Sequence, residues 1–375
     1  MRIGIDAYPL TRVKAGIGYY THNLIKHLLE IDTGNEYVLY HNIDDKISMR
    51  HPQLKYSTIS GKSLWRYSTP WFLLKAKQDL LRDKIDVFWG TSSIVPVGLP
   101  RSIKVALTIY DLVVHFYSYT MENINYLVTK SFFSKSVLRA DKIIAISHTT
   151  ANDLENFYPG ISDKSSVAYI GVDNGLFRVR NRTECLSRVC HKYSLKPDFM
   201  LFVGTIEPRK NLISLIRAFK ILKSKYAVPH QLVIAGGTGW KQSSILKEIS
   251  AKKEDVRFIN YVPELDLAEL YSSAGLFVMP SLYEGFGMPV VEAMASGTAV
   301  AISDIPIFRE VAADAALFFD PRNPEDIAEK MHTLISNAGL RNSLAGKGIQ
   351  RVQAFSWKES AKHLINIFNE LHRDR

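Results

Sequence analysis

Short runs of apolar residues alternate with longer amphipathic stretches along most of the chain. In the first half, this pattern predicts strands at 2–8, 36–41, 86–90, 105–111 and 142–147. In the second half, it predicts strands at 199–204, 231–237, 256–262, 275–281, 299–303 and 316–320. Helical patterns, such as 17–30 and 123–139, separate several of these runs. Strands that are apolar on both faces and alternate with helices are typical of parallel sheets covered on both sides.

A break in this alternation divides the chain in two. Residues 174–197 show no strand pattern and are rich in Arg and Lys, which is typical of a domain junction. We therefore predict an α/β protein with two doubly wound, Rossmann-like domains, 1–173 and 198–355, and a basic linker between them. Ligands of such sheets bind outside the carboxyl ends of the strands. Two sheets that face one cleft would suit an enzyme that joins two substrates.

Composition and charge narrow the possible partners. The 375 residues carry a formal net charge of +10, which indicates nucleic acid, an anionic membrane surface or a phosphorylated substrate. Solubility alone is an equally good explanation of the charge. No apolar run approaches the ~20 residues that span a bilayer, and the N-terminus resembles a strand more than a signal peptide. Cys185 and Cys190 are the only cysteines, so we expect a cytoplasmic protein without disulfides.

One glycine-containing loop follows the first predicted strand. Gly16 and Gly18 stand at the predicted start of a helix, where free N–H groups and the helix dipole attract anions. The dinucleotide fingerprint requires a third glycine where this chain has Thr21, so a nicotinamide enzyme is disfavoured. A purely structural turn is an equal alternative.

A second loop places two cations after a strand. Gly204 and Thr205 end the run FMLFVGT, and Arg209 and Lys210 stand just before the next helix. An arginine can bind phosphate with a forked pair of hydrogen bonds, and a lysine acts as a point charge. A solvated turn is the alternative, but the position at a strand end favours phosphate binding.

The segment PSLYEGFGMPVVEAMA, residues 280–295, contains two acids around a glycine turn. Glu284 is predicted to lie in the loop after a strand, and Glu292 about one turn into a helix that begins near Pro289. Gly285 and Gly287 allow the backbone to bend around a ligand. Two carboxylates that accept hydrogen bonds from hydroxyl groups, close to phosphate-binding cations, predict a site for a sugar nucleotide. A helix-stabilising charge is the alternative for Glu292 alone.

Three segments resemble a known enzyme family. FVGTIEPRKN, SLYEGFGMPVVEAMASGTAV and FSWKESAKHL are similar to motifs of the retaining GT-B glycosyltransferases of family 4, or glycosyl transferases group 1. EGFGMPVVE matches the E-x7-E motif of that family. The resemblance covers nearly the whole chain and is most specific in its second half. It implies a GT-B fold with an N-terminal acceptor domain, a C-terminal nucleotide-sugar domain and a final helix, 356–375, that returns to the N-terminal domain.

The resemblance also implies roles for the basic pair and the first acid. Arg209 and Lys210 match the pair that binds the donor diphosphate and stabilises its departure. Glu284 matches the acid that contacts hydroxyl groups of the donor sugar. We therefore expect Glu284→Ala to abolish transfer, and we expect the fold to stay intact because the acid is predicted to lie in an open loop.

Further donor contacts follow from the same match. The residues implied in donor binding are Gly16, Gly18, Gly204, Thr205, Gly285, Phe286, Gly287 and Glu292, the last as the acid that holds the ribose hydroxyls. The chain departs from the family at the dipeptide Tyr110-Asp111, where relatives commonly have His-Asp. A tyrosine is not a base near neutral pH, so a general-base role there is in doubt. We prefer a site residue to a core tyrosine at this position.

The implied reaction uses a nucleotide sugar as substrate and requires no cofactor. Arg209, Lys210 and a helix N-terminus can stabilise the leaving diphosphate without a metal. No two Asp residues stand two positions apart, so the DxD pattern of a metal-binding glycosyltransferase is absent from the sequence. A covalent intermediate would need a carboxylate near the anomeric carbon, and the sequence assigns none.

The donor and acceptor follow from the resemblance to bacterial mannosyltransferases. We expect mannose from GDP-mannose, a glycan or polyprenyl-diphosphate-linked acceptor, and a role in O-antigen, capsule or exopolysaccharide synthesis. UDP-glucose, UDP-GlcNAc and dTDP-rhamnose stay open as donors. A sugar-nucleotide epimerase of the same build is the second hypothesis. A nucleic-acid-binding protein is the third, and it is disfavoured because no nucleic-acid motif accompanies the charge.

The segment 62–84 combines six cations with aromatic residues, including Trp65, Tyr67 and Trp71. Thr69-Pro70 predicts the start of a helix. A basic, aromatic helix can lie in an anionic membrane interface, so we expect peripheral association with the cytoplasmic face of the inner membrane. The alternative is that Trp71, Leu74 and Leu81 pack on the sheet.

Overall fold

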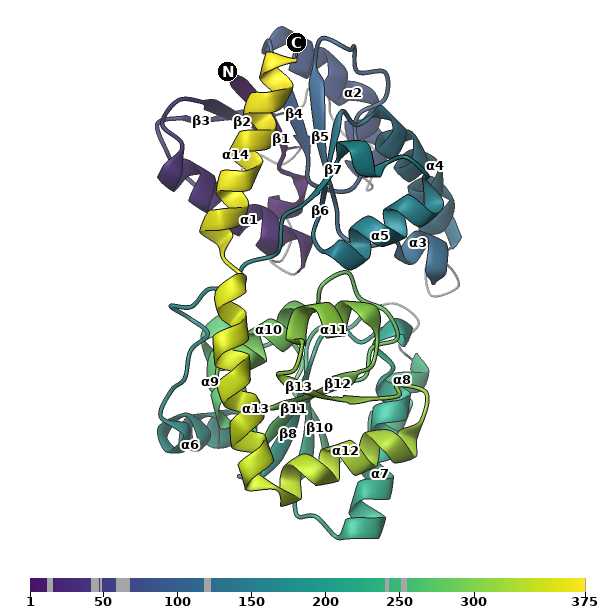
Figure 1. The fold of residues 1–375 in the computed structure, drawn as a ribbon, viewed down its shortest axis with the longest axis vertical. Helices are drawn as coiled ribbons and strands as arrows, with labels where there is room; N and C mark the ends of the chain where they lie inside the picture. Colours follow the sequence, from purple (N-terminus) through teal and green to yellow (C-terminus); the bar gives the residue numbers. More distant parts are fainter. Residues whose placement is uncertain are drawn as a thin grey trace. The chain divides into compact units, whose positions relative to one another are not determined.

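The computed structural model describes residues 1–11, 16–41, 47, 49–58, 68–117, 123–239, 243–250 and 255–374. The chain divides into two compact units (Figure 1). The first contains Met1–His115, Asn123–Gly171 and Ser356–Arg375, and the second contains Phe116–Glu122 and Val172–Phe355.

The first unit is built on a seven-stranded sheet. Its strand order is β3-β2-β1-β4-β5-β6-β7, and each pair of neighbouring strands is parallel. The strands are β1 (Arg2–Asp6), β2 (Glu36–His41), β3 (Leu54–Thr58), β4 (Val87–Gly90), β5 (Lys104–Ile109), β6 (Lys142–Ala145) and β7 (Ser165–Val167). The helices are α1 (Ile17–Ile31), α2 (Ser68–Arg82), α3 (Val113–Phe116, at the junction with the second unit), α4 (Asn123–Arg139), α5 (His148–Phe157) and α14 (Trp357–Arg373).

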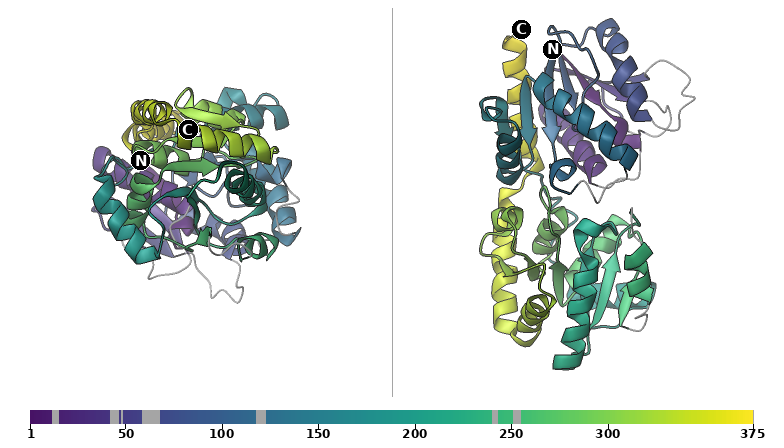
Figure 2. Two further views of the ribbon diagram at one scale, coloured as in Figure 1. Left: turned by 90° about the horizontal axis from the view of Figure 1, so that it is seen from below. Right: turned by 90° about the vertical axis from the view of Figure 1, so that its right-hand side faces the viewer.

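The second unit repeats this plan with six parallel strands. Its order is β10-β9-β8-β11-β12-β13. The strands are β8 (Phe199–Val203), β9 (Gln231–Ala235), β10 (Val256–Phe258), β11 (Leu276–Met279), β12 (Val300–Ser303) and β13 (Ala316–Phe319). The helices are α6 (Arg182–Tyr193), α7 (Leu212–Tyr226), α8 (Ser243–Ser250), α9 (Glu264–Ser273), α10 (Met288–Ala295), α11 (Pro306–Ala312), α12 (Pro324–Ser336) and α13 (Ala338–Arg351). Helices cover both faces of each sheet (Figure 2).

The chain returns to the first unit at its C-terminus. Ser356 caps α14 by accepting a hydrogen bond from the backbone N–H of Glu359 at 3.4 Å. Trp357 then packs so closely on Gly171 that a Cβ there would lie 2.3 Å from the Trp357 backbone nitrogen. Helix α14 packs along α1, and the two helices lie side by side in Figure 1. The final helix is therefore an integral part of the first unit.

Two strands and one helix were not predicted from the sequence. Strand β3 contains Lys, Ser and Thr, and strand β7 contains two Ser. Both strands lie at an edge of the sheet, where polar residues replace the continuous apolar run of a central strand. Residues 174–197 were predicted to be a linker, but they contain α6, which packs against α9. Asn181 caps α6 by accepting hydrogen bonds from two backbone N–H groups of its first turn. The segment is thus an ordered part of the second unit.

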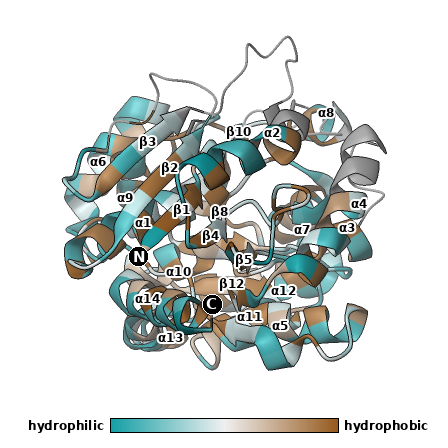
Figure 3. Cartoon of the chain, turned by 90° about the horizontal axis from the view of Figure 1, so that it is seen from above, coloured by the Kyte–Doolittle hydropathy of each residue, from teal (hydrophilic) through white to brown (hydrophobic). Residues whose placement is uncertain are grey.

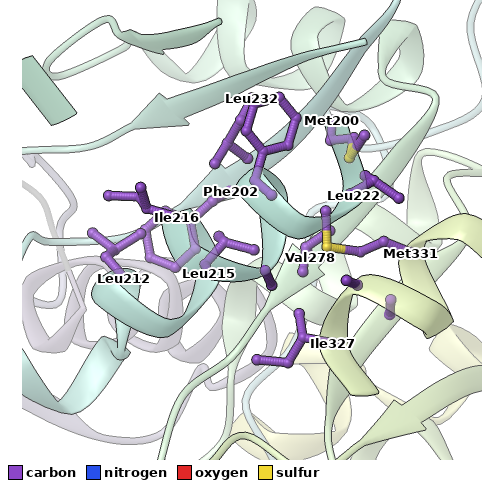
Figure 4. Packing of buried hydrophobic residues seen from close by; sticks show 14 of the residues in the cluster. Met200, Phe202, Leu212, Leu215, Ile216, Leu222, Leu232, Val278, Ile327 and Met331 are labelled. Atoms are coloured by element: carbon purple, nitrogen blue, oxygen red, sulfur yellow. The ribbon is translucent and has the colours of Figure 1, made fainter. Parts of the chain in front are cut away.

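The apolar core of the second unit positions the carboxyl ends of its strands. Figure 4 shows side chains of β8, β9 and β11 packed against those of α7 and α12. Phe202 of β8, Leu222 of α7 and Met331 of α12 are completely buried. Burial of such a side chain contributes roughly 1.5–3 kcal/mol. In Figure 3 the hydrophobic colour concentrates on the strands, whereas the surrounding helices are banded in both colours.

In the part of the chain that the structure describes, every helix is too short or too polar to cross a lipid bilayer.

Candidate active site

The predicted site residues of the second unit gather where its strand order reverses. From β8 the chain adds β9 and β10 on one side of the sheet and then β11, β12 and β13 on the other. The loops after β8 and β11 therefore leave the sheet in opposite directions, which creates a crevice at the carboxyl ends of these two neighbouring strands. Ligands of doubly wound sheets bind at this switch point.

A short turn links β8 to α7 and contains both basic residues. It spans Pro208–Lys210 as a single 3₁₀ turn, and Asn211 then takes a left-handed conformation with φ of 57°. The side-chain amide of Asn211 donates hydrogen bonds to the carbonyl oxygens of Pro280 at 3.1 Å and Pro321 at 2.7 Å. These bonds tie the turn to the ends of β11 and β13. Gly204, half-buried, and Thr205, exposed, precede it at the end of β8.

The two cations and Glu284 form one buried ion cluster. The Lys210 ammonium donates to Oε1 of Glu284 at 2.5 Å, and the Arg209 guanidinium donates to Oε2 at 2.7 Å. The Ser281 hydroxyl donates to Oε1 at 2.8 Å. Arg209 also donates to Glu207 at 2.6 Å. Two positive and two negative charges thus cancel inside the cluster, and each charged side chain is at most 13% exposed.

The electrostatics of Glu284 correct one expectation from the sequence. Burial alone would raise its pKa, but the charges of Arg209 and Lys210 outweigh burial and hold the pKa at about 2. Glu284 is therefore ionised across the physiological range and 6% exposed. The sequence analysis predicted that Glu284 faces solvent, and this prediction is wrong because the side chain is buried. The expectation that the fold tolerates Glu284→Ala rested on that predicted exposure. Removal of the carboxylate would leave two buried cations short of a partner.

The glycine loop after Glu284 leads directly into α10. Gly285 and Phe286 are buried, and the Phe286 ring meets Phe355 edge-on at 5.3 Å between centroids. Gly287 is the residue before α10 and has φ of 92°, in the region that favours glycine. A Cβ there would lie 2.6 Å from the Phe308 ring. This position therefore requires glycine both for its conformation and for the close approach of Phe308.

Glu292 lies on α10, in a different environment from Glu284. The hydroxyl group of Tyr271 donates to its Oε2 at 2.9 Å. Burial, reinforced by the negative charge of Glu264, raises the pKa of Glu292 to about 7, although the bond from Tyr271 opposes that shift. The two acids of the E-x7-E motif thus have opposite pKa shifts, because only Glu284 is paired with cations.

The predicted residues of the first unit lie at the carboxyl ends of its strands. Gly16 precedes α1 and is exposed, whereas Gly18 is buried, and a Cβ on Gly18 would lie 2.8 Å from the Pro9 carbonyl oxygen. Asp111, half-buried, accepts a hydrogen bond from the backbone N–H of Val113 at 3.1 Å. The close approach of the Pro9 carbonyl oxygen explains why a glycine is needed at position 18, whether or not a ligand binds there.

Tyr110 is a core residue of the first unit. Its hydroxyl group donates to the carbonyl oxygen of Thr91 at 2.8 Å, and its ring meets Tyr20 edge-on. Burial raises the pKa of Tyr110 well above its usual value, so the hydroxyl stays protonated. We predicted from the sequence that Tyr110 is a site residue, and these contacts give no support to that prediction. They explain the tyrosine as part of the core.

Three residues of the second-unit site were missed from the sequence. Glu207 orients Arg209, Ser281 donates to Glu284, and Tyr271 donates to Glu292. The position of Glu207, two residues before an Arg-Lys pair at a strand end, was a usable signal. Tyr271 lies on another element, α9, so its contact depends on tertiary packing.

The chain is similar to known proteins in sequence and in fold. The profile described as Glycosyltransferase Family 4 matches residues 15–175, and that of Glycosyl transferases group 1 matches residues 189–351. O-antigen chain mannosyltransferase B of Escherichia coli is 27% identical over 381 residues, with 97% of each chain covered. O-antigen chain mannosyltransferase RfbU of Salmonella typhimurium is 30% identical over 224 residues, or 60% of this chain and 58% of that protein. Sucrose-phosphate synthase from Thermosynechococcus elongatus has a similar structure, with a TM-score of 0.78, 18% identity and both chains fully covered.

Two doubly wound parallel sheets, with a site at the switch point of the second, define a GT-B α/β protein. The chain belongs to the glycosyl transferases group 1, preceded by a family 4 domain, and it is a glycosyltransferase. The family resemblance and the fold predicted from the sequence are both confirmed.

Proposed function

We propose that the enzyme transfers mannose from GDP-mannose, with retention, to a glycan or polyprenyl-diphosphate-linked acceptor in the synthesis of a bacterial surface polysaccharide such as O-antigen. The observation that carries the proposal is the ion cluster of Arg209, Lys210 and Glu284 at the switch point. The choice of mannose rests on two similar proteins that are O-antigen chain mannosyltransferases.

The cluster suits departure of a diphosphate. Lys210 has three donor protons and Arg209 five, so both can bind a phosphate while they hold Glu284. In the proposed reaction the bond between the anomeric carbon and the diphosphate oxygen breaks, and the acceptor oxygen attacks from the same face. The hydroxyl proton of the acceptor passes to the departing phosphate. Arg209 and Lys210 stabilise the negative charge that develops on the diphosphate.

The donor base and the reaction class need separate experiments. A thermal-shift screen of GDP, UDP, TDP and ADP should show the largest stabilisation with GDP, since a ligand at 100 times its dissociation constant stabilises by about 2.7 kcal/mol. Incubation with GDP-mannose and acceptor should then yield a new glycosidic bond. A preference for UDP would overturn the donor, and an isomerised donor without transfer would identify an epimerase.

We predict that donor affinity depends on the ionisation of Glu292. Its raised pKa of about 7 means that the carboxyl group is largely protonated below that pH. A protonated carboxyl group accepts fewer hydrogen bonds from the ribose hydroxyls. The dissociation constant for GDP, measured by calorimetry, should therefore rise as the pH falls from 8 to 6. A Glu292→Gln variant should bind GDP more weakly at pH 8 and show a flatter profile.

The same shift predicts the reverse effect on stability. The folded state binds this proton more tightly than the unfolded state, so the stability falls as the pH rises from about 4.5 to about 7, and the full loss persists above that. Glu292→Gln removes the loss and should stabilise the protein by up to about 3 kcal/mol at pH 8, and by less at pH 5.5. Urea unfolding of the wild type and the variant at pH 8 and pH 5.5 measures the difference in stability. An equal difference at the two pH values would contradict the raised pKa of Glu292.

We also propose that α2 docks the enzyme on the anionic cytoplasmic face of the inner membrane. Leu74 and Leu81 are 66% and 45% exposed, so these two leucines do not pack on the sheet, which was the alternative suggested by the sequence. Phe72 and Leu73 are the buried side of α2. Trp65 and Tyr67, and the side chain of Trp71, lie outside the described residues.

Exposed cations flank the two leucines. Lys75 and Lys84 are exposed, and so is Arg82, although Arg82 pairs with Asp79 and Asp83. Each cation near an anionic surface contributes about 1 kcal/mol to binding, and the leucines add apolar area to bury. Exposed cations on α2 and just after it, together with the exposed leucines of α2, therefore suit an anionic lipid surface.

The double variant Leu74→Ser/Leu81→Ser should bind anionic liposomes several-fold more weakly than the wild type. Co-sedimentation at low and high salt measures this, with neutral liposomes for comparison. The matched control is Leu265→Ser, since Leu265 is 70% exposed but lies on α9 in the second unit. Equal binding of all three proteins, or no binding to anionic lipid, would leave the enzyme without this membrane contact.

A further inference from the structure

A second cavity lies at the opposite end of the same sheet from the candidate active site. Its volume is about 470 Å³. Asp198, His230, Gly275 and Ala299 line it, and each is the residue immediately before a strand, namely β8, β9, β11 and β12. The cavity is therefore at the amino ends of the strands, whereas Arg209, Lys210 and Glu284 lie at the carboxyl ends.

Two arginines from different helices line this cavity. Arg182 is the first residue of α6, and among the described residues its guanidinium has no hydrogen-bond or ion-pair partner. Arg341 of α13 uses one nitrogen, Nη1, to donate to the carbonyl oxygens of Leu334 at 2.8 Å and Ile335 at 3.0 Å. Two arginines from separate elements that line one cavity can each donate to an anion.

The rest of the lining contains both polar and apolar residues. His230 is half-buried and adds an imidazole ring to the lining. Asn342 and Thr298 add an amide and a hydroxyl oxygen to the lining. Asp198 contributes the one acid of the lining, against the two arginines.

We propose that this cavity is a second ligand site, which binds the phosphoryl group of a small phosphorylated molecule between Arg182 and Arg341. A phosphoryl dianion matches two guanidinium groups in charge and in hydrogen-bond geometry. The volume exceeds what inorganic phosphate fills and falls in the range of small-molecule sites. The polar lining then contacts the organic part of the ligand.

The site does not depend on the proposed donor chemistry. Its lining shares no residue with the cluster at the carboxyl ends of the strands. A ligand there would be bound by the same unit as the donor, at the other end of β8 and β11. The test can therefore be made by binding alone, without acceptor or transfer.

Calorimetric titration with inorganic phosphate tests the proposal on the intact protein. We expect binding in the millimolar range, and Arg182→Glu should weaken it tenfold or more. Arg182 is exposed and its guanidinium makes no hydrogen bond or ion pair within the described residues, so this variant should keep its fold, which its unfolding temperature checks. Asp198→Asn should have the opposite effect and tighten binding, because it removes the negative charge that faces the anion.

The matched control is Arg209→Ala, which changes the other end of the sheet and should leave the phosphate affinity at this cavity unchanged. No phosphate binding by the wild-type protein would overturn the proposal. Phosphate binding that is unaltered in both Arg182→Glu and Asp198→Asn would also overturn it. If only Arg209→Ala removed phosphate binding, the phosphate would occupy the candidate active site, and the proposal would likewise be wrong.

Discussion

Glu284→Ala is expected to destabilise the protein by about 3–5 kcal/mol and to abolish transfer. The carboxylate is the shared partner of Arg209 and Lys210, at 2.7 Å and 2.5 Å, and the three side chains are at most 13% exposed. Removal of one member of a buried ion pair costs this much because the remaining charge stays buried without compensation. Urea unfolding of the wild type and the variant at pH 7 measures the loss, and it should be accompanied by a loss of turnover.

Two further variants separate charge from shape. Glu284→Gln keeps the size of the side chain and an oxygen that can accept from Ser281, so it should lose less stability than alanine but also lose activity. Glu359→Ala is the matched control: it removes an acid paired with Lys362 on the surface, where both side chains are more than half exposed. Such pairs contribute at most about 1 kcal/mol. If Glu284→Ala were no more destabilising than Glu359→Ala, the buried cluster would not exist in solution.

Arg209→Ala and Lys210→Ala are each expected to lower the turnover number roughly a hundredfold, because loss of one preorganised charge at a reacting centre typically costs about 3 kcal/mol. Both cations lie at the switch point and are at most 13% exposed. Arg209→Lys should recover only part of the activity, since lysine cannot make the forked contact with Glu207 and Glu284.

Steady-state kinetics with saturating donor measure the effect. Arg188→Ala is the control, because Arg188 pairs with Glu269 on the surface of the same unit, and its turnover should match the wild type. Full activity of both cluster variants, together with loss of activity in EDTA, would contradict the proposed metal-independent mechanism.

The central strands of both sheets followed from the sequence because they are buried on both faces. The run FMLFV is fully buried as β8, and an uninterrupted apolar run of this kind is the strongest signal of a parallel strand. Strand β3, LKYST, was missed because an edge strand can carry residues such as Lys55 and Tyr56 toward solvent. Helix α6 was missed because only two of its residues, Cys185 and Val189, are buried, so its apolar periodicity is weak.

The candidate site was predictable as a set of residues and not as a set of contacts. Motif spacing placed Arg209 and Glu284 in loops after two strands, and parallel topology makes such loops neighbours. The sequence carries no measure of how deeply those loops are buried. It therefore gave no indication that the acid and the cations bind each other, or that Tyr271 would hold Glu292.

Tyr110 illustrates a second limit. A motif match assigns a position to a family role, but the role depends on where the side chain points. The Tyr110 hydroxyl group donates to the Thr91 carbonyl oxygen inside the first unit, and this bond is set by the packing of β4 against β5. Residue identity alone does not distinguish that arrangement from one in which the hydroxyl group faces a ligand.

A calorimetric titration of GDP into the wild-type protein and Arg209→Ala at pH 8 tests whether the Arg209–Lys210–Glu284 cluster binds the diphosphate of a nucleotide-sugar donor. We expect the wild type to bind one GDP and the variant to bind it at least tenfold more weakly, since one charged hydrogen-bond donor to phosphate is lost. Equal affinity for GDP in the two proteins would contradict diphosphate binding by the cluster.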